Sequence, residues 1–297
     1  MKPQPQHMAV LASPDTSGTK DASNSPESAR NRATSETSQG KRNSSGLLIV
    51  NADDWGRDSN TTKKIFECRR AGTVSSVSAM VFMADSEGAA ALAQESGIDA
   101  GLHLNFTLAF SSSACPGSVQ ERQRALSAYL SRHSLAQVVF HPGLVRSFEY
   151  VVNAQLDEYT RLYGAPPRRI DGHHHMHLCA NVQFSRLLPA GTLVRRNFSF
   201  RRGEKSLVNR LYRQALDRRL AKRHQIVDFL FPLSPLEPMM RLENIRRLAH
   251  EFVVEVETHP VNADEYSFLT EGEASRWAGE VPIAAHFARP NVDGSKL

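Results

Sequence analysis

Short apolar runs that end in acidic or imidazole side chains constrain the fold of this chain more than any other feature. The run Leu47–Val50 is followed directly by the polar residues Asn51–Asp54. A continuous apolar run of this length is typical of a strand that is buried on both faces of a parallel sheet. The same arrangement recurs in three later segments, at His103, at residues 171–177, and at Glu257 with His259. Parallel α/β folds collect functional groups at the carboxyl ends of their strands, so we expect these four segments to share one site.

The segments between these runs carry helical signals. Residues 59–72 place Ile65 and Phe66 on an apolar face, with Ser59 or Asn60 as the N-cap and Gly72 as the stop. Residues 147–164 form a second amphipathic pattern that ends at Gly164. Further strands are expected within 73–82, 98–107, 168–178 and 251–261, and further helices within 84–97 and 205–224. Residues 113–144 are expected to be an insertion over the top of the sheet, with short helices. This alternation predicts an α/β fold with mainly parallel strands and no second domain.

Residues 1–45 differ in composition from the rest of the chain. They are rich in Ser, Thr, Asn, Gln, Pro and charged residues and almost free of large apolar side chains. Such a segment cannot bury enough surface to offset the entropy lost on ordering. We therefore expect a disordered tail over 1–45 and a single domain over 46–297. A regulatory or targeting arm is the alternative interpretation of the tail.

The sequence constrains the location of the protein and the role of its net charge only weakly. No signal-peptide core and no apolar run of roughly 20 residues is present, so no membrane span is expected. Three cysteines without a CxxC pair favour a reducing compartment, and we expect a cytoplasmic protein. The net charge of +5 arises from clusters such as 218–219 and 222–223, without interleaved aromatic residues. An excess of positive charge can indicate affinity for nucleic acid or for an anionic membrane. We interpret these clusters instead as a solvated helix face and expect no nucleic-acid partner.

Carboxylate and imidazole groups at one sheet edge predict a metal site. An aspartate at a strand end is often only a helix N-cap, and a lone histidine is usually an ordinary packed residue, so it is the set of four segments that favours a site. Such ligands suit Zn²⁺, Mn²⁺, Fe²⁺, Ni²⁺ or Co²⁺, whereas Mg²⁺ prefers oxygen ligands. Cys179 is the sole thiol near these motifs, which excludes a zinc finger. One aspartate and two histidines leave coordination positions open, as in catalytic metal sites.

The histidine run RRIDGHHHMHL can be interpreted by strand periodicity. If residues 171–177 are extended, Asp171, His173, His175 and His177 point to one side of the strand and His174 to the other. The odd-numbered members can then share a metal or pocket with neighbouring strands, and those that do not bind the metal can orient its ligands. A pH-sensing histidine patch is the alternative, but such a patch would not need Asp54 or His103.

Four motifs, NADDWG, GLHLNFT, RIDGHHHMHL and ETHPV, resemble in this order and spacing the YdjC-like carbohydrate deacetylase family. This family includes the chito-oligosaccharide deacetylases and the hopanoid-biosynthesis-associated members. The resemblance covers roughly residues 46–270. It implies an irregular (β/α) barrel of the glycoside hydrolase/deacetylase type, in many members a homodimer. It also implies one divalent metal ion, Mg²⁺ or Zn²⁺-like, and an N-acetylated sugar or oligosaccharide as substrate.

The resemblance also implies roles for individual residues. Asp54, His103 and His173 would hold the metal, Asp53 would be the general base, and His259 would be the acid or would orient the substrate. We place His175 and His177 in the substrate pocket, and either could replace His259 as the acid. Three features depart from the family pattern: HPV in place of HPG, LAF after NFT, and Gly172 in place of the usual serine. The C-terminal helix also looks shortened. These departures leave the metal ligands unchanged. They bear on which sugar is bound and on how efficiently the acid step proceeds.

These observations predict a metal-dependent carbohydrate N-deacetylase, a hydrolase that uses metal-activated water. Besides nucleic-acid binding through the basic helix expected over 205–224, two alternatives remain open. One is a metal-dependent hydrolase of another bond, such as a phosphoester or a non-sugar amide. The other is a non-catalytic sugar-binding relative, against which the presence of both Asp53 and Asp54 argues, because binding alone needs no base.

Overall fold

Seven parallel strands form one sheet in the part of the chain that the computed structural model describes, residues 46–132, 134–200 and 204–287. The expected tail, 1–45, lies outside the described residues. The strand order is β5-β4-β3-β2-β1-β7-β6, and each neighbouring pair is parallel. The strands are β1 (Leu47–Trp55), β2 (Ser76–Ala79), β3 (Ala100–Leu104), β4 (Arg169–Gly172), β5 (Leu193–Val194), β6 (Phe229–Pro232) and β7 (Val253–Thr258).

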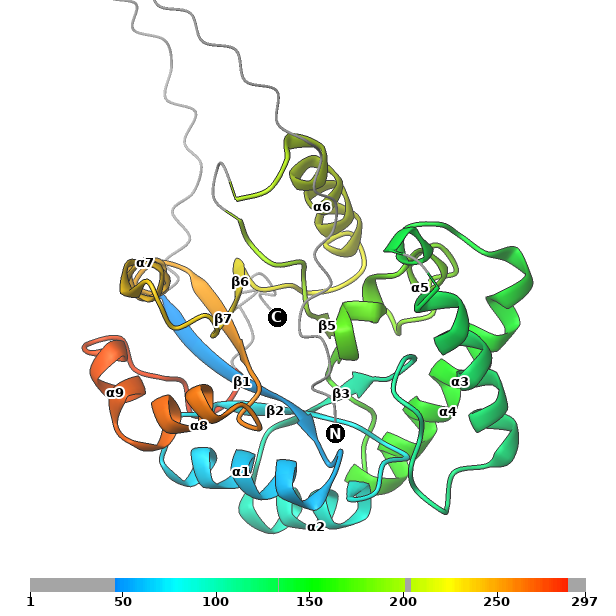
Figure 1. The fold of residues 1–297 in the computed structure, drawn as a ribbon, viewed down its shortest axis with the longest axis horizontal. Coiled ribbons are helices and arrows are strands. Elements are labelled where there is room, and N and C mark those ends of the chain that lie inside the picture. The colour runs from blue at the N-terminus through cyan, green and yellow to red at the C-terminus, as the bar shows by residue number, and fades with distance from the viewer. Residues whose placement is uncertain (1–45, 133, 201–203, 288–297) are drawn as a thin grey trace, which may run out of the picture. The chain divides into compact units, whose positions relative to one another are not determined.

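The sheet curls into a half-barrel with the helices on its outer side, as Figure 1 shows. An isolated parallel bridge between Leu193 and Gln225 joins edge strand β5 to the segment that leads into the other edge strand, β6. The two edges therefore approach each other. The α/β class and the barrel-like architecture predicted from the sequence are both confirmed.

The described helices account for the predicted helical segments and add several at the C-terminal end. They are α1 (Ser59–Arg70), α2 (Ser86–Ser96), α3 (Gly117–Leu130), α4 (Val145–Tyr163), α5 (Ala180–Phe184), α6 (Leu207–Leu220), α7 (Met239–Ala249), α8 (Ala263–Thr270) and α9 (Glu273–Ala278). Three short 3₁₀ segments are η1 (Ser134–Gln137), η2 (Pro142–Leu144) and η3 (His173–Leu178). None of the helices in the described ranges is both long and apolar enough to cross a bilayer.

Two local expectations need correction. The N-cap of α1 is Asp58 rather than Ser59 or Asn60, because the Asp58 carboxylate accepts a hydrogen bond of 2.9 Å from the Thr61 backbone N–H. The region 113–144 is more regular than expected, since it holds the 14-residue helix α3. The predicted stop of α4 is confirmed, because Gly164 adopts the left-handed conformation that ends helices.

The two faces of each strand have different environments. The outward side chains, such as Leu48 and Val50 of β1, are fully buried in the main hydrophobic core with helix residues such as Ile65 of α1. Inward side chains near the amino ends of the strands form a small second cluster around Ile49, Val227 and Val253. Above that apolar floor, the interior of the half-barrel is lined by polar residues.

These polar residues occupy every second position along the strands, as the pleat of a β-strand requires. The inward positions include Asn51 and Asp53 of β1, Ser78 of β2, His103 of β3, Asp171 of β4, and Glu255 and Glu257 of β7, all of them buried. Gly101 leaves room for one of their neighbours, because a Cβ atom there would lie 2.7 Å from the guanidinium carbon of Arg169. The curled sheet thus encloses charged groups and directs them toward its carboxyl edge.

Candidate metal centre

Asp53 and Asp54 are adjacent in sequence, yet both carboxylates reach the interior of the half-barrel. The register of β1 against β2 shifts between Ala52 and Trp55, which is the signature of a β-bulge. Within the bulge Asp54 has a φ of 70°, in the left-handed region that non-glycine residues rarely adopt. The bulge turns Asp54 inward beside Asp53, as expected for two neighbouring acids that serve one site.

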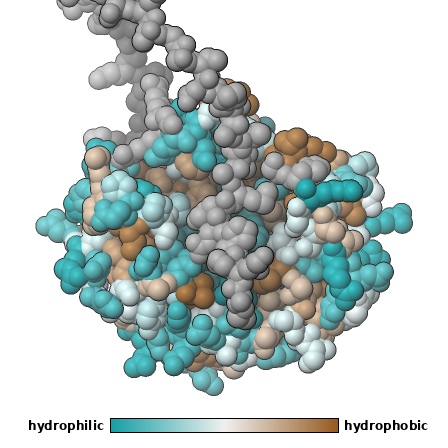
Figure 2. Space-filling view, in the orientation of Figure 1, coloured by the Kyte–Doolittle hydropathy of each residue, from teal (hydrophilic) through white to brown (hydrophobic). Residues whose placement is uncertain are grey.

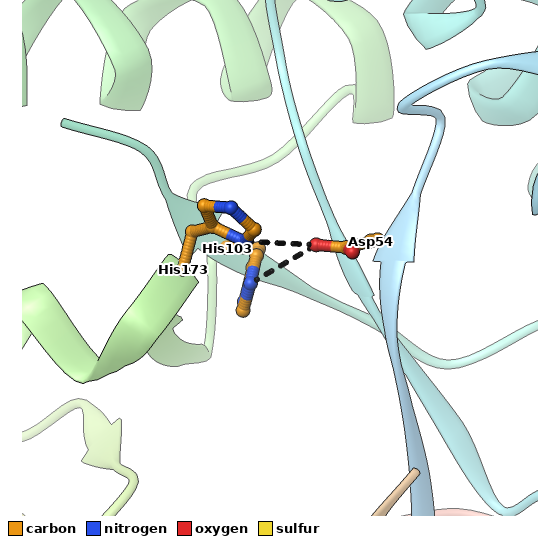
Figure 3. A group of neighbouring side chains, drawn as sticks. All are labelled: Asp54, His103 and His173. Atoms are coloured by element: carbon orange, nitrogen blue, oxygen red, sulfur yellow. Dashed lines mark hydrogen bonds and ion pairs between the residues drawn. The ribbon is translucent and has the colours of Figure 1, made fainter. Parts of the chain in front are cut away.

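Asp54, His103 and His173 converge from three different elements, β1, β3 and η3 (Figure 3). The Oδ1 atom of Asp54 lies 3.1 Å from Nδ1 of His173 and 3.5 Å from Nε2 of His103. One ligand atom from each residue lies within 4.8 Å of the others. The three predicted metal ligands are therefore brought together, with Asp54 and His103 buried and His173 half-buried.

The donor set fits a divalent cation. Nδ1 of His103 is paired with Oδ1 of Asp171 at 2.7 Å, while its Nε2, which faces Asp54, is buried without a hydrogen-bond partner. A carboxylate that fixes one imidazole nitrogen and leaves the other for a metal is the usual support of a histidine ligand. A buried nitrogen without a partner costs free energy, and a cation at this point would offset that cost. The other oxygen of Asp54 accepts a hydrogen bond of 2.7 Å from Arg57.

Two further residue groups have metal-compatible spacing, but their carboxylates are already engaged. They are Asp53 with His103 and Asp171, and Asp53 with Glu257 and His259. Asp53, Asp171 and Glu257 all pair with the guanidinium of Arg195. The geometry therefore favours Asp54, His103 and His173 as the metal-holding set.

Arg195, directly after β5, organises the interior of the half-barrel. Its side chain is 1% exposed and donates to both oxygens of Asp53, at 2.6 and 2.7 Å. It also lies 2.8 Å from Glu255, 3.0 Å from Glu257 and 3.1 Å from Asp171. Bidentate pairing fixes the plane of a carboxylate, so Arg195 holds Asp53 in one orientation beside the metal-holding set. Sequence interpretation missed this residue.

Electrostatics favour the ionised forms of Asp54 and Asp171. Burial alone would raise the pKa of Asp54, but the hydrogen bond and charge of His173 hold it well below its usual range. Burial would likewise raise the pKa of Asp171, and the charge of Arg195 and the hydrogen bond with His103 lower it. Burial would lower the pKa of His103, but the carboxylates of Asp53 and Asp171 raise it to about 9. Without a metal, His103 is therefore protonated at neutral pH.

Metal affinity is expected to rise with pH, because the cation and the proton compete for Nε2 of His103. The pKa of His103 near 9 places this competition below that pH. The apparent affinity should increase by roughly tenfold per pH unit up to about pH 9 and level off above it, with about one proton released per metal bound. Titration calorimetry in buffers of different ionisation enthalpy measures both quantities. An affinity that stays constant between neutral pH and pH 9 would contradict the assignment of His103.

The histidine run does not form the extended strand predicted from the sequence. Strand β4 ends at Gly172, and His173–Leu178 form the 3₁₀ segment η3. His174 and His175 have positive φ values of 53° and 57°. The predicted alternation of sides is therefore wrong, since the chain turns as soon as it leaves the sheet.

The turn distributes the later histidines over different environments. Nε2 of His175 lies 3.1 Å from Oε2 of Glu257, with the imidazole partly exposed. His177 is fully buried, and its Nε2 lies 2.9 Å from the carbonyl oxygen of Arg195. Burial and the charge of His175 lower the pKa of His177 to about 3. His177 therefore stays neutral and supports the loop that carries Arg195. Because its side chain is fully buried, it exposes no atom that could contact a substrate.

His259 lies at the carboxyl edge of the sheet, directly after β7. Burial would lower its pKa, but the carboxylates of Glu257 and Asp53 raise it above the usual value. Its backbone N–H donates to Glu265 of α8. His259 thus lies beside Asp53 and Glu257, whose carboxylates favour its protonated form.

Comparison with known proteins gives one family and one fold. The family model described as YdjC-like protein matches residues 47–283. A solved structure of a candidate cellobiose-phosphate cleavage protein from Enterococcus faecalis V583 aligns with a TM-score of 0.57 at 19% identity, covering 81% of this chain and 97% of that chain. At this identity the likeness concerns the fold alone.

Curated relatives match in part of their length. The chitooligosaccharide deacetylase of Proteus mirabilis (strain HI4320) is 36% identical over 136 residues, which cover 46% of this chain and 52% of that protein. The chitooligosaccharide deacetylase of Serratia marcescens is 35% identical over 137 residues, 44% of this chain and 51% of that protein. The chain thus spans about half the length of the curated relatives it matches.

Proposed function

The chain belongs to the YdjC-like protein family, and from that premise we propose that it is a metal-dependent carbohydrate N-deacetylase. The observation that supports the proposal most is that the bulge of β1 brings two acids, Asp53 and Asp54, to one site in different surroundings. Asp54 faces two imidazoles, one of which has an unpartnered buried nitrogen, and its neighbour Asp53 is held by Arg195. One acid is thus available for a metal and the other for a proton. The deacetylase names of the curated relatives supply the substrate class.

In this proposal Asp54, His103 and His173 hold one divalent cation. When bound, the cation supplies Lewis acidity, which polarises the acetamide carbonyl and lowers the pKa of water. Magnesium and zinc are both compatible with one carboxylate and two imidazoles, and zinc suits the imidazoles better.

The residues of the chain perform the proton transfers. Asp53, oriented by both nitrogens of Arg195, accepts the proton of the attacking water as the new C–O bond forms. His259, whose pKa is raised by Glu257 and Asp53, donates a proton to the departing amine as the C–N bond breaks. We assign the contact with the sugar to His175, which is paired with Glu257. Acetate and an amino sugar are the products.

The alternatives to a deacetylase make different products. We expect equal amounts of acetate and free amine when purified protein is incubated with oligomers of N-acetylglucosamine and a divalent metal. Release of phosphate from phosphoesters, with no acetate from any N-acetylated sugar, would instead identify a hydrolase of another bond. Sugar binding without product would identify a non-catalytic relative.

A further inference from the structure

Helix α6 presents an unusual face to solvent. Leu207, Val208, Leu211 and Tyr212 are 66%, 78%, 55% and 43% exposed. Residues spaced three and four apart share one side of a helix, so these four form a continuous apolar patch on the first half of α6. Figure 1 places α6 at the top of the described body, and Figure 2 shows hydrophobic and hydrophilic side chains interspersed over this face of the molecule. Large aliphatic side chains exposed side by side indicate a surface that contacts an apolar phase or partner.

The second half of the same face is strongly basic. It continues through Arg218 and Arg219 to Lys222 and Arg223 beyond the end of the helix. With Arg186 after α5, these cations line a pocket of about 440 Å³ between α5 and α6. We call the apolar patch and this pocket together the α6 surface.

The charge of the α6 surface is uncompensated within the described part of the chain. No aspartate or glutamate lines the pocket, and none of its five cations lies within 4.0 Å of a carboxylate oxygen of a described residue. The acid of the same helix, Asp217, is buried on the other side and pairs with Arg196. Nδ1 of His224, also in the pocket lining, is buried without a hydrogen-bond partner. Five like charges around one concavity raise the local potential and attract a phosphate-type anion.

We infer that the α6 surface docks the protein on an anionic phospholipid membrane. A helix with adjacent apolar and Lys/Arg-rich regions lies in the plane of a bilayer interface, with its aliphatic side chains among the acyl chains and its cations on lipid phosphates. Leu207, Val208 and Leu211 would enter the interface, and Arg218 and Lys222 would contact headgroups. This is peripheral binding and needs no membrane-spanning helix. It is independent of the proposed deacetylase activity.

Two other occupants fit the surface less well. Nucleic acid would use the cations but would leave the exposed aliphatic side chains without a role, because phosphate contacts dominate such binding. A second copy of the chain in a two-fold dimer could cover the apolar patch, but it would leave the cations of the pocket without counter-charges, because the described α6 surface offers no carboxylate.

Vesicle co-sedimentation of the full-length protein tests the inference. We expect binding to vesicles of phosphatidylcholine with phosphatidylglycerol and little binding to phosphatidylcholine alone. The double variant Arg218→Glu/Lys222→Glu should bind the anionic vesicles roughly thirtyfold more weakly. Val208→Ser/Leu211→Ser should lose roughly tenfold or more, because two aliphatic side chains leave the interface. All four side chains are exposed, so circular dichroism should show both variants folded.

A matched control separates local from global charge. Lys63→Glu/Arg70→Glu makes the same change in net charge at exposed positions of α1, away from α6 in Figure 1, and should retain vesicle binding. Equal losses in both charge variants, or equal binding to neutral and anionic vesicles, would overturn the inference. So would saturable binding of inorganic phosphate or of single-stranded RNA, sensitive to Arg218→Glu/Lys222→Glu, in a protein that does not bind vesicles.

Discussion

Replacing Asp53 by asparagine is expected to reduce turnover by roughly 10²–10⁴-fold, the usual contribution of a general base. The amide has nearly the shape of the carboxylate but cannot take a proton. The metal-holding residues Asp54, His103 and His173 keep their positions, so metal affinity should stay within a few-fold of the wild type. Steady-state acetate release and metal titration on the same protein measure the two effects separately.

Glu255→Gln is the matched control for this experiment. It also removes a carboxylate from Arg195, at 2.8 Å, but Glu255 belongs to none of the metal-compatible groups among the described residues. We expect its turnover loss to be far smaller than that of Asp53→Asn. Similar losses in the two variants would show that Asp53 acts only as a partner of Arg195.

Replacing Arg195 by methionine is expected to lower the free energy of unfolding by about 3–5 kcal/mol, the cost of leaving buried charges unpaired. The substitution leaves the carboxylates of Asp53, Asp171 and Glu257 facing one another without their shared cation. Chemical denaturation at neutral pH measures the loss. Arg196→Met, at the next position, removes the partly exposed pair with Asp217 and the hydrogen bonds that Arg196 donates to the carbonyl oxygens of Val227 and Asp228. It should cost much less, roughly 1 kcal/mol.

The loss in Arg195→Met should shrink as the pH falls. In the folded wild type the pKa values of Asp171 and Glu257 are lowered despite burial, by Arg195 and by histidine neighbours. Groups with lowered pKa values stabilise the fold above their unfolded pKa, near 4, and this contribution is lost as the pH drops through the folded value. Since the variant lacks the cation that lowers these pKa values, its carboxylates take up protons at higher pH. A deficit that is independent of pH, or no larger than that of Arg196→Met, would contradict the role of Arg195.

The sheet and the position of the site could be predicted from the sequence because both depend on local patterns. Buried parallel strands read as apolar runs, and the polar residues that follow them, such as Asp54 and His103, meet at one edge. The bulge at Asp54 is not part of this local pattern, because adjacent residues of a regular strand point to opposite faces.

The conformation of the histidine run could not be predicted in the same way. Two successive left-handed residues, His174 and His175, are rare in any sequence without glycine. Gly172 gives a partial signal, because a Cβ atom there would lie 3.0 Å from the backbone nitrogen of His177. The serine usual in the family at this position would require His177 to shift.

Arg195 was missed because its strand gives almost no periodic signal. Strand β5 has two residues, and GTLVRRNF contains two adjacent arginines of which one is buried. The alternation of Glu255 and Glu257 with valines in β7 did carry information: two acids on one face of a buried strand require a cation inside the fold. The sequence does not show whether Arg195 or Arg196 is that cation, because this depends on tertiary contacts with β1, β4 and β7.

Acetate release after metal removal and add-back tests the central claim most directly, with wild type, His103→Ala and His174→Ala measured in parallel. His174 stacks on His173 and belongs to none of the metal-compatible groups in the described chain, which makes it the matched control. We expect wild type and His174→Ala to lose activity on chelation and to regain it with one divalent ion per chain. His103→Ala should neither bind the ion tightly nor recover activity. Full activity in the chelated wild type, or recovery of His103→Ala to the wild-type level, would contradict this claim.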